Sequence, residues 1–530
     1  MKHRIISSIL LPLLFVAPFS GVQASIMIED LTAGTGPGFG DSLNRYSWSS
    51  ESFNDDLYIG TFNVGFDLTA LPGYANQIAN APNPGLAGLD AFRRLWSGSP
   101  VTPSTGGEIW RYKNSTWEQV LKTDSEDVGF RSMTKHGDYI YAASANGPNG
   151  PSPSDPNYSF PGTVNYGTGP VPAPDPDIAG TQIFRSMDGE NWEEVAGGPS
   201  ANPLNASSRS MTVINGQLVL GTENPIGGSE LWSCTICDGT DWVNPVTMPG
   251  TLAIGKVAEF GGETIFGTWG TGAQLFKLNG GAPVEITPTF ADPDVLNSDS
   301  GVMELIKFNG RFYLTTVDYT DGFTMLSTDN PHDPTSWKVH TKDGFKTEYP
   351  ALAGSENNAY GWTAIVKDGV MYLGTFNSNK TGSDIDQALG FDLPLDGRGQ
   401  IWSTADGMSF QLVEGNGFDS FGTYGFRTST IWNDQLIFGS ASNFFLPDLT
   451  NFPYEEYGFT IEDFKAELLA HFGSDLFSDQ FEIGFEDFSE LYSLGTQVFA
   501  LSVVPEPEIL VLFGVGLFGL GFARRRKQDH

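Results

Sequence analysis

Residues 209–242 read RSMTVINGQLVLGTENPIGGSELWSCTICDGTDW, and this stretch decides the fold. Two short turns, Asn215-Gly216 and Asp238-Gly239, separate runs in which apolar residues alternate with polar ones. An Asn-Gly or Asp-Gly pair between alternating runs is a strong local signal for a β-hairpin. The stretch therefore predicts four antiparallel strands that follow one another along the chain.

The same pattern recurs along the chain. Aligned on Gly221, near the end of the second strand, the equivalent positions are Gly60, Ala143, Gly267, Thr315, Gly374 and Gly439. A repeat that varies in length but keeps its order of strands and turns is typical of a ring of four-stranded blades. The sequence predicts an all-β fold, a seven-bladed β-propeller of four-stranded antiparallel blades, over residues 25–504.

The seventh copy lacks a fourth strand, because the chain reaches Pro505 soon after the third-strand aromatic residue Phe499. The segment from Ser25 to Leu31 is short, apolar and placed before the first copy. We expect this mature N-terminal strand to supply the missing strand and close the ring, which removes an exposed sheet edge. An open stack of sheets is the alternative.

Both ends of the chain carry targeting segments. Lys2 and Arg4 precede an apolar run, and the small residues that signal peptidase requires stand before a cleavage site after Ala24. Residues 1–24 are therefore predicted to be a signal peptide that signal peptidase removes. At the other end an apolar stretch at 509–523 predicts a transmembrane helix, although a stable span usually needs about 20 residues. The basic cluster that follows holds the C-terminus in the cytoplasm.

The last segment, 505–530, has three parts in order: Pro505-Glu506-Pro507, the apolar stretch, and the cluster Arg524, Arg525, Arg526. This order resembles the PEP-CTERM sorting signal of exported bacterial proteins. The resemblance implies processing by an exosortase and delivery to the cell surface or cell envelope, often in bacteria that secrete exopolysaccharide. Until that processing the helix would anchor the protein in the membrane. A plain membrane anchor is the alternative.

The repeats also resemble those of Kelch and related secreted propellers. The stretch from Ser186 to Trp192 is similar to the Asp-box turn of sialidase-like propellers, with the spacer between Asp188 and Gly189 missing. Asp-box turns lie in outer hairpins and are architectural, so this resemblance implies nothing about catalysis.

Charge excludes one class of partner. The chain has 63 acidic and 28 basic residues and a net charge of −35. Nucleic acid is therefore not an expected partner, because binding to phosphate backbones requires a basic surface.

The only two cysteines, Cys234 and Cys237, lie in the outer hairpin of the third copy. In an exported protein they predict a disulfide that fixes this turn. A thioredoxin-like redox role would need a βαβ setting, and a zinc site would need two further ligands nearby.

Links between the second and third strands are long in copies one, two, six and seven, and short in the others. The longest predicts a small helical insertion over about 455–493. The four copies are consecutive in a closed ring, so we expect their links to rise from one sector of one face.

Side chains suited to ligand binding recur in the same sector. Twelve residues before the aligned glycine the copies have, in order, Trp48, Arg131, Arg209, Gly255, Met303, Trp362 and Arg427. Asn63, Asn146, Asn224, Asn377 and Asn443 end second strands. Aromatic faces suit sugars, and guanidinium groups bind carboxylates. We expect a ligand site at the channel mouth on the long-link face, formed by Trp48, Arg131, Arg209, Trp362, Arg427, Asn63, Asn146 and Asn377. In the alternative, the arginines pair with neighbouring blades and the asparagines cap turns.

Catalytic and metal-binding patterns are sparse. No histidine cluster, Gly-x-Ser-x-Gly elbow or Walker loop occurs in the sequence. Asp384 and Asp386 offer oxygen ligands for Ca²⁺, although such residues more often belong to an acidic surface loop, and no other cofactor is expected.

Three functions fit these patterns. The first is a cell-surface propeller that binds an envelope or exopolysaccharide ligand. The second is a propeller-type glycoside hydrolase or polysaccharide lyase, and the third a structural protein of the extracellular matrix.

Overall fold

The computed structural model describes 11 stretches of the chain, namely residues 25–63, 106–124, 127–146, 180–224, 227–270, 272–279, 281–350, 357–377, 398–420, 423–442 and 495–504. By its internal contacts the chain divides into two units, Glu29–Ala500 and Met1–Ile28 with Leu501–His530. The predicted signal peptide, the helical insertion at 455–493 and the sorting segment at 505–530 lie outside the described residues.

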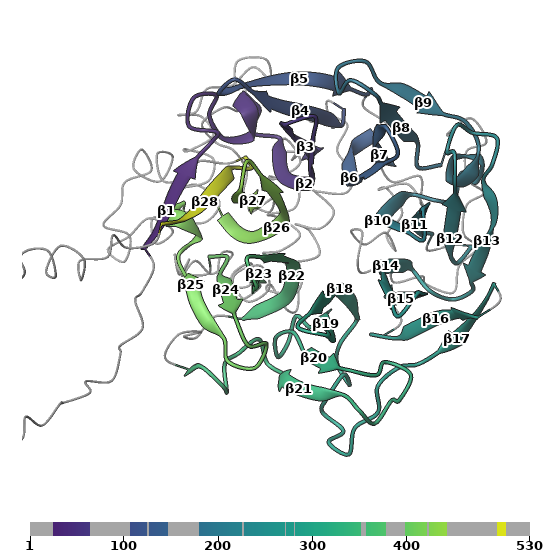
Figure 1. Cartoon of the computed structure of the whole chain (residues 1–530), viewed down its shortest axis with the longest axis vertical. Helices are drawn as coiled ribbons and strands as arrows, with labels where there is room; N and C mark the ends of the chain where they lie inside the picture. Colours follow the sequence, from purple (N-terminus) through teal and green to yellow (C-terminus); the bar gives the residue numbers. More distant parts are fainter. Residues whose placement is uncertain are drawn as a thin grey trace, which may run out of the picture. The chain divides into compact units, whose positions relative to one another are not determined.

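The described chain is all-β, with 28 strands and almost no helix. Fourteen strands form a closed antiparallel ring, seen end-on in Figure 1. In ring order they are β2 (Asn44–Phe53), β3 (Asp56–Asn63), β6 (Asp127–His136), β7 (Tyr139–Asn146), β10 (Ser207–Ile214), β11 (Gln217–Glu223), β14 (Ala253–Phe260), β15 (Glu263–Trp269), β18 (Gly301–Phe308), β19 (Arg311–Val317), β22 (Asn358–Lys367), β23 (Val370–Asn377), β26 (Thr423–Trp432) and β27 (Gln435–Ser442).

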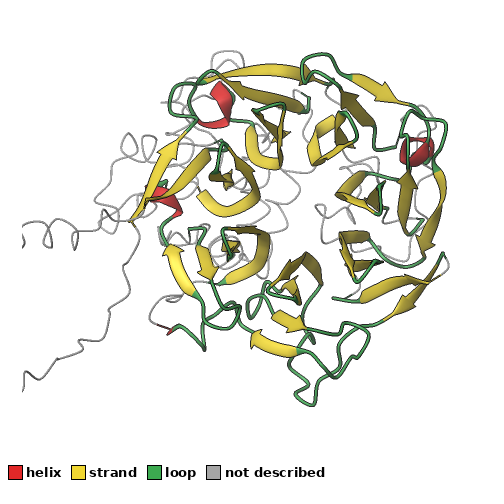
Figure 2. Ribbon diagram, in the orientation of Figure 1, coloured by secondary structure: helices red, strands yellow, loops and turns green. Residues whose placement is uncertain are grey.

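Further strands extend the ring outward, two on each second strand (Figure 2). They are β4 (Glu108–Lys113), β5 (Thr116–Lys122), β8 (Ile183–Ser186), β9 (Glu193–Val195), β12 (Ser229–Cys234), β13 (Val243–Met248), β16 (Leu275–Asn279), β17 (Ala282–Glu285), β20 (Met325–Thr328), β21 (Lys338–Thr341), β24 (Ile401–Thr404), β25 (Gln411–Glu414), β28 (Val498–Val504) and β1 (Ser25–Asp30). Three short 3-10 helices are described, η1 (Pro37–Gly40), η3 (Gly198–Ala201) and η4 (Gly417–Asp419).

Neighbouring pairs of ring strands meet through single residue pairs. Phe62 of β3 pairs with Gly129 of β6, and the ring closes where Tyr46 of β2 pairs with Ala441 of β27. Because so few backbone bonds join the pairs, side chains packed between adjacent sheets must carry most of the cohesion. Seven buried apolar clusters do this, each between neighbouring sheets or around the centre of the ring.

The aligned glycine of the repeat has a packing reason. A Cβ atom on Gly60 would lie 2.7 Å from the Cβ of Phe130, and one on Gly221 would lie 2.5 Å from a methyl carbon of Ile254. Both neighbours belong to the next sheet of the ring. The glycine therefore permits the close approach of adjacent sheets.

The acidic or amide residue that opens the third strand is also structural. Glu108 accepts hydrogen bonds from Trp110 Nε1 at 2.7 Å and from Asn44 Nδ2 at 2.8 Å. Glu230 binds Trp232 and Asn205 in the same way, and Gln400 binds Trp402 and Asn358. The repeated motif thus satisfies buried polar groups and ties the third strand to the start of the first.

Candidate functional site

Each innermost strand contains a β-bulge at the same place. The pairing register shifts across Trp48, Arg131, Arg209, Gly255, Met303, Trp362 and Arg427. A bulge inserts one unpaired residue into a strand and redirects its side chain. The seven positions that the sequence aligns are therefore the seven bulged residues of the ring.

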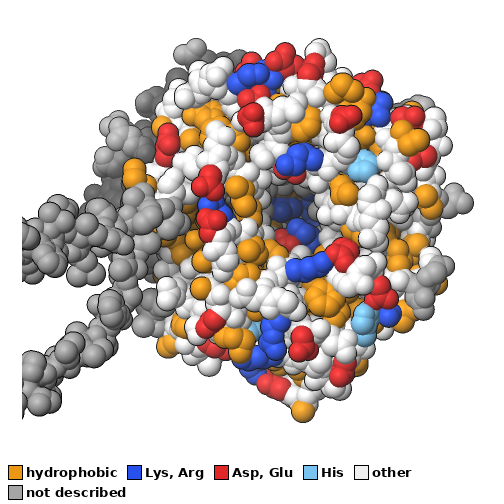
Figure 3. All heavy atoms as spheres, viewed as in Figure 1, with side chains coloured by type: hydrophobic (Ala, Val, Ile, Leu, Met, Phe, Trp, Pro, Cys, Tyr) orange, Lys and Arg blue, Asp and Glu red, His pale blue; other side chains and the backbone are white. Residues whose placement is uncertain are grey.

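These seven residues line one cavity of about 120 Å³. Figure 3 looks into the hollow at the centre of the ring, where basic side chains are visible. The rest of the lining comes from residues that follow the bulges, including Ser49, Ser132, Lys256, Glu304 and Thr428. The structure thus brings together Trp48, Arg131, Arg209, Trp362 and Arg427 from five different strands.

Each of the three arginines lies over a tryptophan ring. The guanidinium carbon of Arg209 is 3.3 Å from the ring centroid of Trp269, that of Arg131 is 5.0 Å from Trp48, and that of Arg427 is 5.6 Å from Trp362. Stacking on an aromatic face fixes the plane of a guanidinium group.

Trp48 and Trp362 are themselves largely buried. Only 7% of Trp48 and 6% of Trp362 is exposed, and the ring of Trp48 also contacts Phe62 with centroids 4.1 Å apart. Their described contacts orient arginines within the protein. A role for these rings in stacking on sugars stays a prediction.

Carboxylates balance part of the positive charge. Glu223 at the end of β11 accepts a hydrogen bond from Arg131 and lies 3.8 Å from Arg209, while Glu304 pairs with Lys256 at 2.9 Å. Burial alone would raise the pKa of Glu223, but Arg131 and Arg209 lower it overall. Glu223 is therefore held as a carboxylate between two guanidinium groups.

Arg209 and Arg427 remain under-compensated. Burial first, and then repulsion from Arg131, lowers the pKa of Arg427 to about 10. Burial and the positive charges of Arg131 and Arg427 also lower the pKa of Arg209 well below its ordinary value. Both shifts indicate positive charge that is concentrated in a poorly solvated place.

The cavity extends toward one face of the ring. Every lining residue is a bulged residue or lies within two positions after it, on the side of the turn to the second strand. The starts of the inner strands contribute aromatic residues instead, among them Tyr46, Tyr360 and Tyr424, which form a buried cluster with Phe62 and Phe376. We expect a mouth on the long-link face from the sequence. The described part of the lining continues toward the opposite face, because aromatic rings occupy the starts of the inner strands.

Two of the predicted asparagines lie outside the described lining of the cavity. Asn63 and Asn377 are fully buried and are not part of its lining. Asn63 donates to Asn44 Oδ1 at 3.0 Å, and Asn224 donates to Asn205 Oδ1 at the same distance. Asn146 is the last residue of β7, and Asn443 lies outside the described residues. Asn63 and Asn224 thus link the end of the second strand to a residue that precedes the inner strand or begins it, and a role for Asn63, Asn146 and Asn377 in binding a ligand stays a prediction.

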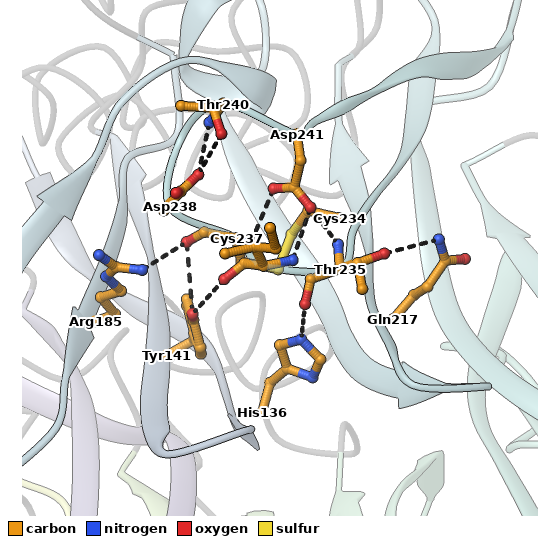
Figure 4. Close-up of a disulfide and its surroundings, with 11 residues drawn as sticks. His136, Tyr141, Arg185, Gln217, Cys234, Thr235, Cys237, Asp238, Thr240 and Asp241 are labelled. Carbon is orange, nitrogen blue, oxygen red and sulfur yellow. Dashed lines mark hydrogen bonds between the residues drawn. A yellow bond between two sulfur atoms is a disulfide. The ribbon is translucent and has the colours of Figure 1, made fainter.

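Cys234 and Cys237 form a disulfide at the end of β12, as Figure 4 shows. The carboxylate of Asp241 accepts hydrogen bonds from the backbone N–H groups of Thr235, Ile236 and Cys237. Arg185 Nη1 donates to the Cys237 carbonyl at 3.2 Å, which ties the turn to the neighbouring sheet. The disulfide and these hydrogen bonds hold the outer turn in one conformation.

The calcium and membrane predictions fall outside the described residues. Asp384 and Asp386 are not described, and the residues that are described contain no group of three metal-ligating side chains. Within the same ranges, no helix has the length and apolar character needed to cross a bilayer. The predicted helix at 509–523 is not among those residues.

Sequence reasoning missed three charged residues around the cavity. They are Glu223, Lys256 and Glu304. Nothing in the sequence distinguishes them from the many other charged residues, although Lys256 and Glu304 directly follow bulged residues. It also missed the buried polar residue four positions before each bulge. This series is Asn44, Asp127, Asn205, Thr251, Asp299, Asn358 and Thr423. Its fixed spacing was the available signal.

The chain thus combines an all-β ring that has a basic centre with a strongly acidic composition. Its C-terminal segment matches a known sorting motif. The model of the PEP-CTERM protein-sorting motif matches residues 503–527. This motif indicates an exported protein that is processed by an exosortase and sorted to the cell surface. No curated protein matches the chain.

Several solved structures are similar to the chain at low identity. A structure titled "YCF48 bound to D1 peptide" shares 10% identity over 79% of this chain and 94% of that chain, with a TM-score of 0.39. A chain of the mitotic checkpoint complex shares 10% identity over 82% and 96%, with a TM-score of 0.41. Trypanosoma rangeli sialidase in complex with sialic acid shares 12% identity over 62% and 54%, with a TM-score of 0.33.

Proposed function

We propose that the chain is a seven-bladed β-propeller closed by its mature N-terminal strand. Its support is the grouping of strands in fours and the pairing of β1 with β28. The backbone N–H of Leu31 donates to the Val498 carbonyl at 2.9 Å, and Trp117 Nε1 donates to the Leu31 carbonyl at 2.8 Å. In this proposal residues 1–24 are a signal peptide, and residues 505–530 are the sorting segment.

This exported propeller binds an envelope polysaccharide or exopolysaccharide. One observation carries the proposal: all seven innermost strands place a bulged residue at the same cavity, and three of the seven are arginines. Arg131 pairs with Glu223 of the neighbouring sheet, whereas Arg427 has no ion pair among the described residues, and buried cations require compensation. A charged group of a ligand that enters the centre of the ring could be bound by all three arginines.

The cavity favours binding over hydrolysis. Most glycoside hydrolases use a pair of carboxyl groups about 5–10 Å apart across the scissile bond. Among the residues lining this cavity, Glu304 is the one carboxylate, and it is engaged by Lys256. The described geometry therefore offers no acid and nucleophile pair at the centre.

A titration of the purified full chain against extracted surface polysaccharide tests the proposal. Calorimetry measures binding, and size-exclusion chromatography of the recovered polysaccharide measures chain length. We expect saturable binding with unchanged chain length. Shortened polysaccharide would instead identify a hydrolase or lyase, and an absence of both binding and shortening would identify a structural matrix protein.

A further inference from the structure

We propose that the central cavity binds a carboxylate group, so that the polysaccharide ligand is an acidic one that contains uronic acid. This inference rests on the proposed function and specifies the chemistry of its ligand. It comes from four features of the cavity: its charge, buried guanidinium donors without a hydrogen bond among the described residues, the fixed guanidinium planes and its size.

The lining is basic in a strongly acidic protein. Arg131, Arg209, Lys256 and Arg427 face one lining carboxylate, Glu304, while the chain as a whole carries a net charge of −35. Even when Glu223 behind the arginines is included, cations outnumber carboxylates by four to two. A cavity with low-dielectric walls and charge of one sign concentrates ions of the opposite sign.

One guanidinium group has donors to spare. The side chain of Arg209 is 5% exposed, and its Nη1 atom makes no hydrogen bond among the described residues. The Nε atom of Arg131 is likewise buried and unbonded there. Unsatisfied buried donors are costly, and an anion that accepts from them recovers that cost.

The planes of these groups are fixed before a ligand arrives. Arg209 stacks on Trp269, and Arg131 is also held by Ser207 Oγ at 2.7 Å and by Glu223. A fixed planar fork matches the two oxygens of a carboxylate better than a flexible ammonium group does. Little side-chain entropy is then lost on binding.

The size of the cavity limits what enters it. Its volume of about 120 Å³ lies well below the roughly 300–1,000 Å³ that holds a drug-sized ligand. One charged substituent fits this space, while a run of sugar rings must remain on the surface. A uronic acid residue supplies such a substituent on a polysaccharide chain.

The test uses glucuronate and glucose, which differ by a carboxylate, as probes of the full chain in calorimetric titrations. We expect glucuronate to bind and glucose not to bind. Arg209→Gln and Arg427→Gln each remove one cavity cation, and each should weaken glucuronate binding roughly 10- to 100-fold. Arg427 makes no ion pair within the described ranges, so we expect its replacement to leave the fold intact, which thermal unfolding of the variant checks.

Arg311→Gln is the matched control. Arg311 opens β19 and donates to Ser327 Oγ at 3.3 Å, away from the cavity lining. This variant loses the same charge and should bind glucuronate as the wild-type protein does. An equal loss of glucuronate affinity in all three variants would show that the affinity depends only on the net charge of the protein. That result would overturn the proposed carboxylate site.

Other results would also overturn the inference. Glucose that binds as tightly as glucuronate, or inorganic sulfate that binds as tightly, would remove the assignment to a carboxylate. Unchanged glucuronate affinity in both cavity variants would place its site elsewhere. A neutral surface polysaccharide that binds while glucuronate does not would overturn this inference and leave the proposed function standing.

Discussion

Two regions of the ring differ in how their inner strands begin. The long-link sheets, β2–β5, β6–β9, β22–β25 and β26–β28, have inner strands of 10 residues with two shifts of register. The short-link sheets, β10–β13, β14–β17 and β18–β21, have inner strands of 8 residues with one shift.

The difference separates two tasks. The bulge common to all seven strands supplies the cavity, whereas the additional bulge occurs only beside a long link and involves Arg45, Val128, Ala359 and Tyr424. Bulges bend a strand and increase its local twist. The second bulge thus changes the edge of the ring that carries the long links, while the cavity layer stays common to both regions.

The largest expected effect follows from breaking the ion pair that joins the two regions. Glu223 of a short-link sheet binds Arg131 of a long-link sheet, and both side chains are more than nine-tenths buried. Glu223→Gln should lower the free energy of unfolding by about 3–5 kcal/mol, because it leaves buried cations unpaired. Urea denaturation measures this loss.

The pH dependence of the same variant has a definite sign. The pKa of Glu223 is lowered below its ordinary value of 4.5 in the folded state, so its stabilisation is present above that pH and is lost on acidification. The difference between wild type and variant should therefore shrink below about pH 4.5. The control Glu118→Gln, at an exposed carboxylate that pairs with Arg111, should cost about 1 kcal/mol or less. Similar losses in both variants would contradict the role of Glu223.

A second change makes a short-link sheet resemble the others. Asp299 stands four residues before the bulge, where Asn44, Asn205 and Asn358 occur in other sheets. Burial raises the pKa of Asp299 to about 6, so the folded state becomes less stable as pH rises from about 4 to 6. Asp299→Asn should add up to about 3 kcal/mol to the free energy of unfolding at pH 7 and nothing at pH 4.

Thermal unfolding of this variant at several pH values gives the answer. Asp294→Asn, at a side chain that is 76% exposed, is the control and should leave the pH profile unchanged. Destabilisation by Asp299→Asn at every pH would mean that its hydrogen bonds to Thr316 and Thr324 require a carboxylate.

The smallest expected effect tests whether the two regions share one scaffold. Asn63→Ala in a long-link sheet and Asn224→Ala in a short-link sheet each remove a buried amide that donates to an equivalent asparagine. Each should lower the free energy of unfolding by about 1–3 kcal/mol, by similar amounts. A loss confined to Asn63→Ala, measured by the same denaturation, would assign that residue to its long link instead.

Much of the fold could be predicted from sequence because its signals are local. Asn215-Gly216 marked the turn between β10 and β11, and the Cys234–Cys237 turn was placed between β12 and β13, where the structure has it. The segment predicted at Ser25 to Leu31 contains β1, at Ser25–Asp30. Turn chemistry and alternation act over a few residues and need no knowledge of the partner strand.

The site was harder to predict. Counting back from the aligned glycine found Arg131, Arg209 and Arg427, yet a bulge depends on pairing register, which the sequence does not display. The burial of Trp48 and Trp362, and the filling of one end of the channel by Tyr46 and Tyr360, depend on side chains from several sheets at once. Asn63 and Asn377 were suited to ligands by type, and only packing revealed their buried positions.

The common bulge has a consequence for how such a protein changes over time. Residues at these seven places have no partner in the backbone ladder, so Arg, Trp, Met and Gly all occupy them within one ring. Because the ladder pairing does not involve these residues, we expect point substitutions there to change the lining of the cavity and to keep the strand order. Under the proposed function, the ring is a constant scaffold, and a changed preference for a surface polysaccharide would need only single substitutions at the bulged positions.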